Sequence, residues 1–178
     1  QIYKGGGIAA IHAEDDDLIQ HMYKRLEEEG KIEGWRHSEV HSGLSEDLAF
    51  RRVVRLAEQT GAAVYFLHVS AKEGVQVVEE ARGKGLPVYA ETLHNYVCFT
   101  EEDYKRPGGF LIHTYPSLKS TEDREALWRG LIEGSISTTA TDEYATPRDI
   151  KDVGQTILDM TGGHSGVETR MGIIYTEG

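Results

Sequence analysis

The sequence has 178 residues, of which 30 are acidic and 19 basic, giving a formal net charge of -11. This length suits one domain with a real core, and the negative charge, without a local basic patch, argues against nucleic acid or an anionic membrane surface as a partner. The single Cys98 excludes an internal disulfide, and no apolar run reaches the roughly 20 residues that span a bilayer, so we expect a cytoplasmic protein.

The chain opens with a short strand and a helix. Residues 8–11 are an apolar run that stops at His12, which predicts a strand ending on a histidine. The acidic residues 15–17 suit a helix N-terminus, and apolar residues recur on one helical face until Gly30. We therefore predict a helix that fills the space between this acidic start and Gly30.

A polar loop and a second helix come next. Residues 31–43 read as a loop, and Ser45 can cap a helix that ends before Gly61. On that helix Leu48 and Leu56 are expected on the inward face. The loop contains three aromatic side chains that we expect at the surface: Trp35, His37 and His41.

The middle of the chain repeats the arrangement. Residues 63–68 form a partly β-branched, partly aromatic apolar run, typical of a strand buried on both faces, and this run stops at His68. Ser70 and Glu73 have the spacing of a capping box, which predicts that a helix begins there. His68 would then lie in a short strand-to-helix loop.

The remaining elements continue the alternation. We predict a strand over residues 86–91, a helix from Ser120 that buries Ile132, and a strand over residues 135–141 that ends at Asp142. Residues 167–175 read as the start of a further helix.

Alternating strands and helices predict an α/β fold with a parallel sheet. Four such units are half of a (β/α)8 barrel, whose usual length of roughly 250 residues exceeds this chain; a small open doubly wound sheet is the alternative. Because Gln1 is not an initiator methionine and the last helix is still in progress, we expect residues 1–178 to be a partial barrel domain truncated at both ends.

Three strands end on side chains that bind metal ions. His12, His68 and Asp142 occupy the same place in their units, and in parallel barrels such positions meet at one end of the sheet. Two imidazoles and a carboxylate suit zinc or a similar divalent ion. Taken singly, each histidine is more often a hydrogen-bonded structural residue, and Asp142 can be a turn former.

Six segments resemble, in the same order, the C-terminal half of the cyclic amidohydrolases, in the dihydropyrimidinase and hydantoinase branch of the amidohydrolase superfamily. They are residues 11–14, 67–70, 91–96, 127–131, 138–142 and 166–171. The resemblance implies a (β/α)8 barrel with two divalent metals, usually zinc, bridged by a hydroxide that attacks the amide carbonyl of a cyclic substrate.

The resemblance also assigns residues. His12 and His68 match two histidines that hold one metal, while Asp142 matches the aspartate that binds the other and moves the proton to the leaving nitrogen. The other ligands lie before the matching region, so we expect an incomplete site, low metal occupancy and no activity in this fragment alone. The family further suggests a small cyclic amide substrate and a homotetramer.

The sequence departs from the family pattern near the substrate. Glu143 replaces the usual histidine after the aspartate. Thr114 or Tyr115 takes the place of a substrate-contacting serine, and the surroundings of His164 replace an asparagine and a glycine, so these three are the predicted substrate-binding residues. A catalytically inactive dihydropyrimidinase-related scaffold, or a relative of the dihydroorotase or allantoinase type, are the alternatives.

Overall fold

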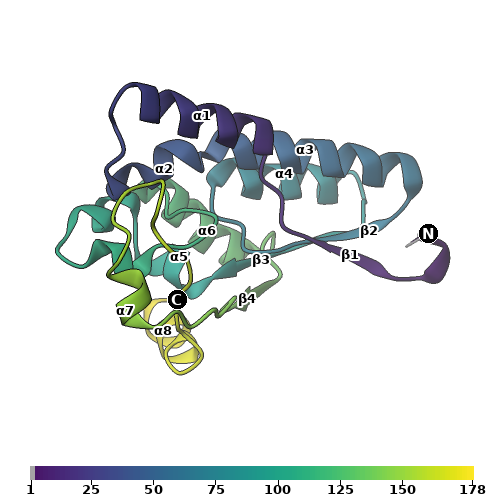
Figure 1. Cartoon of the computed structure of the whole chain (residues 1–178). Coiled ribbons are helices and arrows are strands. Elements are labelled where there is room, and N and C mark those ends of the chain that lie inside the picture. Colours follow the sequence, from purple (N-terminus) through teal and green to yellow (C-terminus); the bar gives the residue numbers. More distant parts are fainter. Residues whose placement is uncertain (1–2) are drawn as a thin grey trace.

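A computed structural model describes residues 3–178, which form a four-stranded parallel sheet with the strands in sequence order (Figure 1). The strands are β1 (Ile8–Ile11), β2 (Ala63–Phe66), β3 (Val88–Leu93) and β4 (Thr138–Ala140). The predicted parallel α/β arrangement is thus confirmed. β1 has the predicted bounds, whereas β2 ends two residues before His68, β3 lies two residues later than predicted and β4 keeps only three residues.

Helices connect the strands. The α-helices are α1 (Asp16–Glu28), α2 (His37–Val40), α3 (Gly43–Thr60), α4 (Lys72–Gly83), α5 (His94–Cys98), α6 (Thr121–Glu133), α7 (Arg148–Lys151) and α8 (Arg170–Glu177). Short 3-10 helices are η1 (Tyr3–Gly5), η2 (Gly34–Arg36), η3 (Glu101–Lys105) and η4 (Gly109–Ile112). The first α-helix, α1, begins after Asp15, whose side chain caps it, as the acidic start predicts.

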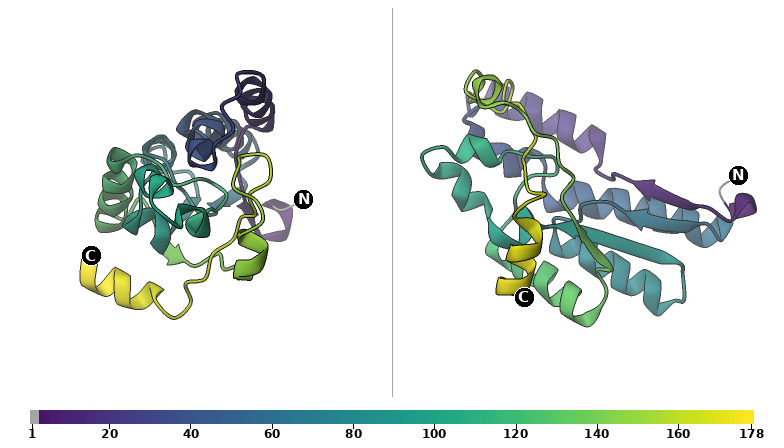
Figure 2. Two further views of the ribbon diagram at one scale, coloured as in Figure 1. Left: turned by 60° about the vertical axis from the view of Figure 1, so that its left-hand side comes forward. Right: turned by 90° about the horizontal axis from the view of Figure 1, so that it is seen from below.

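The long helices cover one face of the sheet. Figures 1 and 2 show α3 and α4 along one side of the strands, while the opposite side is not covered by these helices. On that uncovered side Ile8 is 48% exposed and Tyr89 43% exposed. A doubly wound sheet carries helices on both faces, whereas a barrel carries them only outside. The layering therefore fits part of a (β/α)8 barrel.

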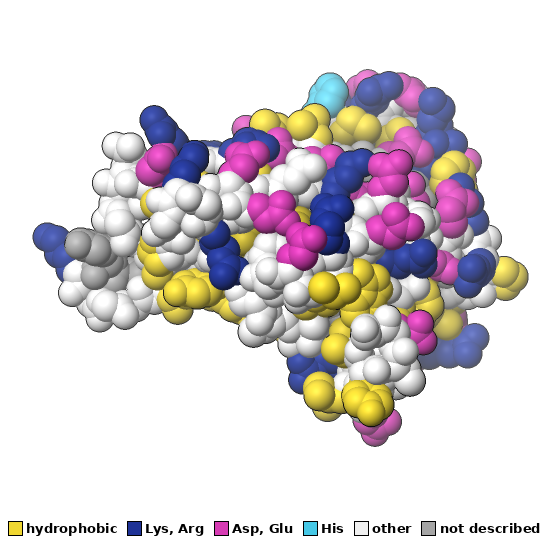
Figure 3. Space-filling view, turned by 180° about the vertical axis from the view of Figure 1, so that it is seen from behind, with side chains coloured by type: hydrophobic (Ala, Val, Ile, Leu, Met, Phe, Trp, Pro, Cys, Tyr) yellow, Lys and Arg dark blue, Asp and Glu magenta, His cyan; other side chains and the backbone are white. Residues whose placement is uncertain are grey.

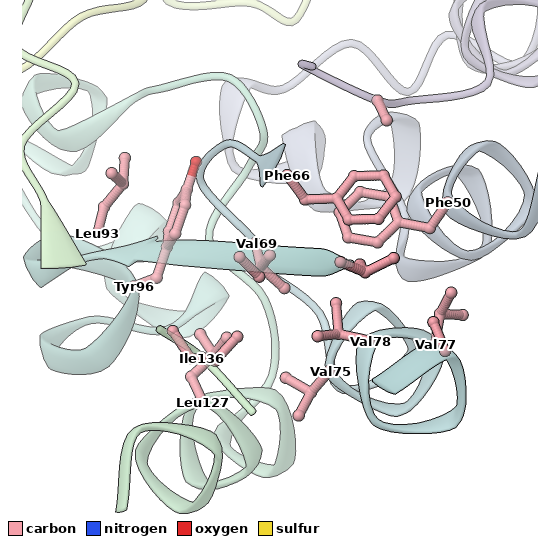
Figure 4. Close-up of a cluster of buried hydrophobic side chains, with 14 of the residues drawn as sticks. Phe50, Phe66, Val69, Val75, Val77, Val78, Leu93, Tyr96, Leu127 and Ile136 are labelled. Atoms are coloured by element: carbon pink, nitrogen blue, oxygen red, sulfur yellow. The ribbon is translucent and has the colours of Figure 1, made fainter. Parts of the chain in front are cut away.

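The core lies between the sheet and these helices (Figure 4). Phe50 of α3 stacks on Phe66 of β2, with ring centroids 3.8 Å apart. Val75 and Val78 of α4 and Leu127 of α6 are fully buried in the same cluster. Burial of each such side chain contributes about 1.5 to 3 kcal/mol, so this layer fixes where the strand ends lie.

Local capping signals failed at the helices on either side of β2. The capping box predicted at Ser70 is wrong, because the first turn of α4 has no side-chain cap of its own. Instead Glu46 of α3 accepts the backbone N–H groups of Ser70 and Ala71 at 3.1 Å and the Ser70 hydroxyl at 2.6 Å. The cap of α3 is Ser42, three residues before the predicted Ser45.

Expectations about burial were also wrong at five side chains. The loop predicted over residues 31–43 contains η2 and α2, and there His37 is fully buried and His41 is 6% exposed rather than at the surface. Leu48 and Leu56 of α3 and Ile132 of α6 were expected inside but are 44%, 61% and 77% exposed. Phe50 and Val54 occupy the inward face of α3 in place of its leucines.

The surface carries charges of both signs. Figure 3 shows Lys and Arg side chains interspersed with Asp and Glu on the face seen from behind. Several form ion pairs, such as Arg51 with both Asp47 and Glu80 and Lys72 with Glu122. Within residues 3–178, no helix is both long and apolar enough to cross a membrane.

Candidate active site

Two of the predicted ligands meet at the carboxyl end of the sheet. Ile11 of β1 pairs with Phe66 of β2, so His12 and His68 follow neighbouring strands that end at the same level. His12 Nδ1 lies 2.9 Å from His68 Nε2, and the two rings are T-shaped, with centroids 4.7 Å apart. The structure therefore brings together side chains that are 56 residues apart in the sequence.

Backbone contacts fix the position of His68. The Leu67 N–H donates to the Ile11 carbonyl of β1, whereas the Val69 N–H donates to the Glu91 carbonyl of β3, both within 3.0 Å. Between them His68 has a φ of +36°, a left-handed conformation that costs free energy in residues other than glycine. Such strain persists where the surroundings over-determine it, and it is often found at functional sites.

The protonation of His68 suits metal binding. Burial, with a smaller effect of the neighbouring His12, lowers the pKa of His68 to about 4, so its imidazole is neutral at neutral pH. The hydrogen bond with Glu14 raises the pKa of His12. A neutral imidazole is the form that binds a metal ion. His68 is therefore in the protonation state that binds a metal ion, whereas the contact with Glu14 favours the charged form of His12.

Glu14 connects His12 to a buried network. Its carboxylate accepts from His12 Nε2 at 3.3 Å and from His41 Nδ1 at 3.0 Å. Burial alone would raise the pKa of Glu14, but these two hydrogen bonds hold it well below its usual range. His41 Nε2 in turn lies 3.1 Å from the Tyr23 hydroxyl. With its Nε2–H directed at the carboxylate, His12 presents Nδ1 to His68, which is the usual orientation of a metal-binding histidine.

Asp142 follows β4 at the same end of the sheet. It has a φ of +44° and, with His68, is one of two residues other than glycine with positive φ among residues 3–178. Its negative charge raises the pKa of both histidines, although the Glu14 hydrogen bond dominates at His12 and burial at His68. In the described part of the chain no group of three or more His, Cys, Asp or Glu side chains is arranged so that it could hold a metal ion. Asp142 is therefore near the histidine pair without joining it.

A cavity of about 440 Å³ opens beside Asp142. Its volume is that of a small-molecule site. It is lined by Thr114, Tyr115, Asp142, Glu143, Tyr144, Thr161, Gly162 and Gly163. Thr114 and Tyr115 thus lie where a molecule next to Asp142 would touch them. His164 is 9% exposed, and its Nε2–H donates to the Thr141 carbonyl at 2.8 Å, so its ring is engaged with the backbone.

The histidine pair fits a metal ion, although it is incomplete as a site. With Zn–N distances near 2.0–2.1 Å, two nitrogens on a tetrahedral ion are roughly 3.3 Å apart, close to the 2.9 Å observed between His12 and His68. The free ring nitrogen of His68, Nδ1, is buried without a hydrogen-bond partner, so this ring is held by packing and by its loop. Further ligands have to come from outside this pair.

Sequence reasoning missed the supporting residues. Glu14 lies two residues after His12, a spacing that can place a carboxylate beside an imidazole, and this was the available signal. His37, whose Nε2–H donates to the Thr114 carbonyl, and His41 gave no signal because their partners are distant in the sequence.

Known proteins resemble this chain over nearly all of it. No established family profile matches. An allantoinase of Deinococcus radiodurans is 31% identical over 97% of the chain and 38% of that protein, and a dihydroorotase of Staphylococcus aureus is 38% identical over 93% and 38%. A crystal structure of a D-hydantoinase superimposes with a TM-score of 0.94 at 27% identity, covering 98% of this chain and 39% of the other. The chain thus spans about 38% of the length of the curated relatives it matches.

Proposed function

Because this chain belongs to the cyclic amidohydrolases and forms part of their barrel, we propose that the complete gene product hydrolyses a carbon–nitrogen bond of a cyclic amide, as a hydantoinase or dihydropyrimidinase does. One observation carries the proposal. The imidazole nitrogens of His12 and His68 meet 2.9 Å apart at the end of the sheet where parallel barrels place their catalytic groups.

His12 and His68 would hold a divalent metal, for which zinc is the best fit to two neutral imidazoles. A bound ion of this kind supplies Lewis acidity and lowers the pKa of water to near 7. In this proposal Asp142 would bind the other metal ion and carry the proton to the leaving nitrogen. Amide nitrogen leaves poorly unless it is protonated, and a carboxylate exposed to the cavity is placed to deliver that proton.

The substrate would enter the cavity of about 440 Å³ next to Asp142. Thr114 and Tyr115 both line this cavity, and Tyr115 is 37% exposed. A small cyclic amide presents N–H and C=O groups in one plane, which suits a wall of one polar and one flat side chain. An inactive scaffold is not favoured, because it has no need for a strained backbone at both His68 and Asp142.

The test is hydrolysis by the complete gene product. Hydantoin, dihydrouracil, dihydroorotate and allantoin would each be assayed with and without a chelator, alongside a measurement of bound metal. We expect hydrolysis of at least one ring, loss of that activity on chelation, and a fall of at least about a hundredfold in kcat in Asp142→Asn. Asp149→Asn, an exposed carboxylate of α7, is the matched control. A metal-free protein that is inactive on all four would overturn the proposal.

A further inference from the structure

The segment that follows the Asp142 turn folds back onto it. We call residues 162–169 the clasp. The Thr146 hydroxyl donates to the carbonyl of Gly162 at 2.8 Å, and the Tyr144 N–H donates to the carbonyl of His164 at 3.2 Å. His164 in turn donates from its Nε2–H to the Thr141 carbonyl at 2.8 Å. The backbone on both sides of Asp142 is therefore bonded to the clasp.

Glu143 makes the strongest of these contacts. One oxygen of its carboxylate, Oε2, accepts the N–H groups of both Gly166 and Val167, each at 2.8 Å. These two hydrogen bonds hold the pKa of Glu143 below its usual range. Two successive backbone N–H groups that point at one carboxylate form a small anion-binding nest. Glu143 is thus a side chain next to Asp142 whose charge is used by the clasp.

Two further contacts hold the clasp and the start of α8 in place. A Cβ on Gly166 would lie 2.0 Å from His94 Cε1, so the imidazole of His94 packs directly against the clasp backbone. Arg170, at the start of α8, donates to the Thr139 carbonyl of β4. Contacts with β4 and with α5, to which His94 belongs, therefore hold the backbone N–H groups that bind Glu143.

We propose that Glu143 is a positioning residue, which ties the clasp to the Asp142 turn and so fixes the left-handed backbone that aims Asp142 at the cavity; the inference rests on the proposed function of Asp142. In the same arrangement His164 supports the turn through its contact with the Thr141 carbonyl. The tie needs an acceptor oxygen, and the charge of the carboxylate strengthens it. A glutamine retains such an oxygen, whereas an alanine does not.

Hydrogen exchange of the complete gene product tests the tie without any substrate. Peptides that cover residues 141–146 and 163–169 would be followed by mass spectrometry in Glu143→Ala, in Glu143→Gln and in the control Glu168→Ala, an exposed carboxylate of the same clasp. We expect exchange in both peptides to rise at least about tenfold in Glu143→Ala, because two charge-assisted bonds are lost. Glu143→Gln should show a smaller rise and Glu168→Ala none.

Kinetic measurements distinguish a residue that positions Asp142 from one that only stabilises the clasp. In an active parent, Glu143→Ala should lower kcat at least about tenfold with less than about a threefold change in KM, and Glu143→Gln should recover most of kcat. Unchanged exchange in Glu143→Ala, a rise confined to residues 163–169, or equal losses of kcat in the alanine and glutamine variants would each overturn the inference. An inactive parent counts against the proposed function alone, since exchange still decides whether Glu143 ties the turn.

Discussion

Gly74 in α4 provides a sharp test of how the His68 loop is held. A Cβ on Gly74 would lie 2.2 Å from Oε1 of Glu46, the carboxylate that accepts the N–H groups of Ser70 and Ala71. Ordinary contact begins near 3.4 Å, so Gly74→Ala has to move this oxygen by more than 1 Å. Glu46 is fully enclosed, so that movement breaks its hydrogen bonds to the loop.

The expected size follows from two opposing terms. Losing two hydrogen bonds to a charged group costs about 1.5 to 3 kcal/mol each, while replacing a glycine by alanine inside a helix gains about 0.5 to 1 kcal/mol. We expect Gly74→Ala to lower the free energy of unfolding by about 2 to 5 kcal/mol. Gly83 is the matched control, because it belongs to the same helix and a Cβ there would meet nothing within 4 Å. Gly83→Ala should raise the free energy of unfolding by about 0.5 kcal/mol.

The assay is urea unfolding at pH 8, followed by circular dichroism, of the parent and both variants. The two alanine substitutions should shift the midpoint in opposite directions. A Gly74→Ala variant as stable as the parent would refute the reasoning, because the Glu46 carboxylate would then not be confined against this helix. Equal shifts in both variants would show that helix propensity alone decides the result.

Three further predictions concern charge, packing and metal. Burial raises the pKa of Glu46 to about 7, above its unfolded value of 4.5. The stability contributed by the protonated carboxyl is therefore present below pH 4.5, and about 3 kcal/mol of it is lost as the pH rises to 7. Glu46→Gln should flatten the pH dependence of the free energy of unfolding, and an unchanged slope would contradict the assignment. Phe50→Ala should destabilise by about 3 to 5 kcal/mol in the same urea assay, whereas Leu56→Ala, at a side chain 61% exposed, should change stability by less than about 0.5 kcal/mol. Residues 1–178 alone should bind zinc substoichiometrically, because one pair of imidazoles falls short of the usual three or more protein ligands; tightly held, stoichiometric zinc by elemental analysis would contradict this.

Local patterns predicted the order of the elements and the edge at which the candidate ligands lie. β1 and the helix that follows it were predicted from a short apolar run and an acidic start. His12 and His68 were placed at strand ends because the apolar runs stop there, and the parallel register then brings them to the same edge. Signals that need only neighbouring residues were therefore sufficient for this part of the structure.

What failed depends on contacts between distant residues. The cap of α4 comes from Glu46, 24 residues before the Ser70 that it binds, and no capping pattern in the sequence contains that pair. His37 is fully buried because its ring reaches the Thr114 carbonyl, 77 residues later, although its own surroundings in the sequence are polar. Such residues become recognisable only when the packing of α2 and α3 against the sheet is known.

The most direct test of the metal assignment is a crystal structure of the complete gene product grown with zinc, with anomalous difference maps collected on both sides of the zinc edge. We predict a zinc peak about 2.0 to 2.1 Å from both His12 Nδ1 and His68 Nε2, with the Asp142 carboxylate next to the metal site. Full zinc occupancy elsewhere, with these two nitrogens still in direct contact at 2.9 Å, would contradict the account.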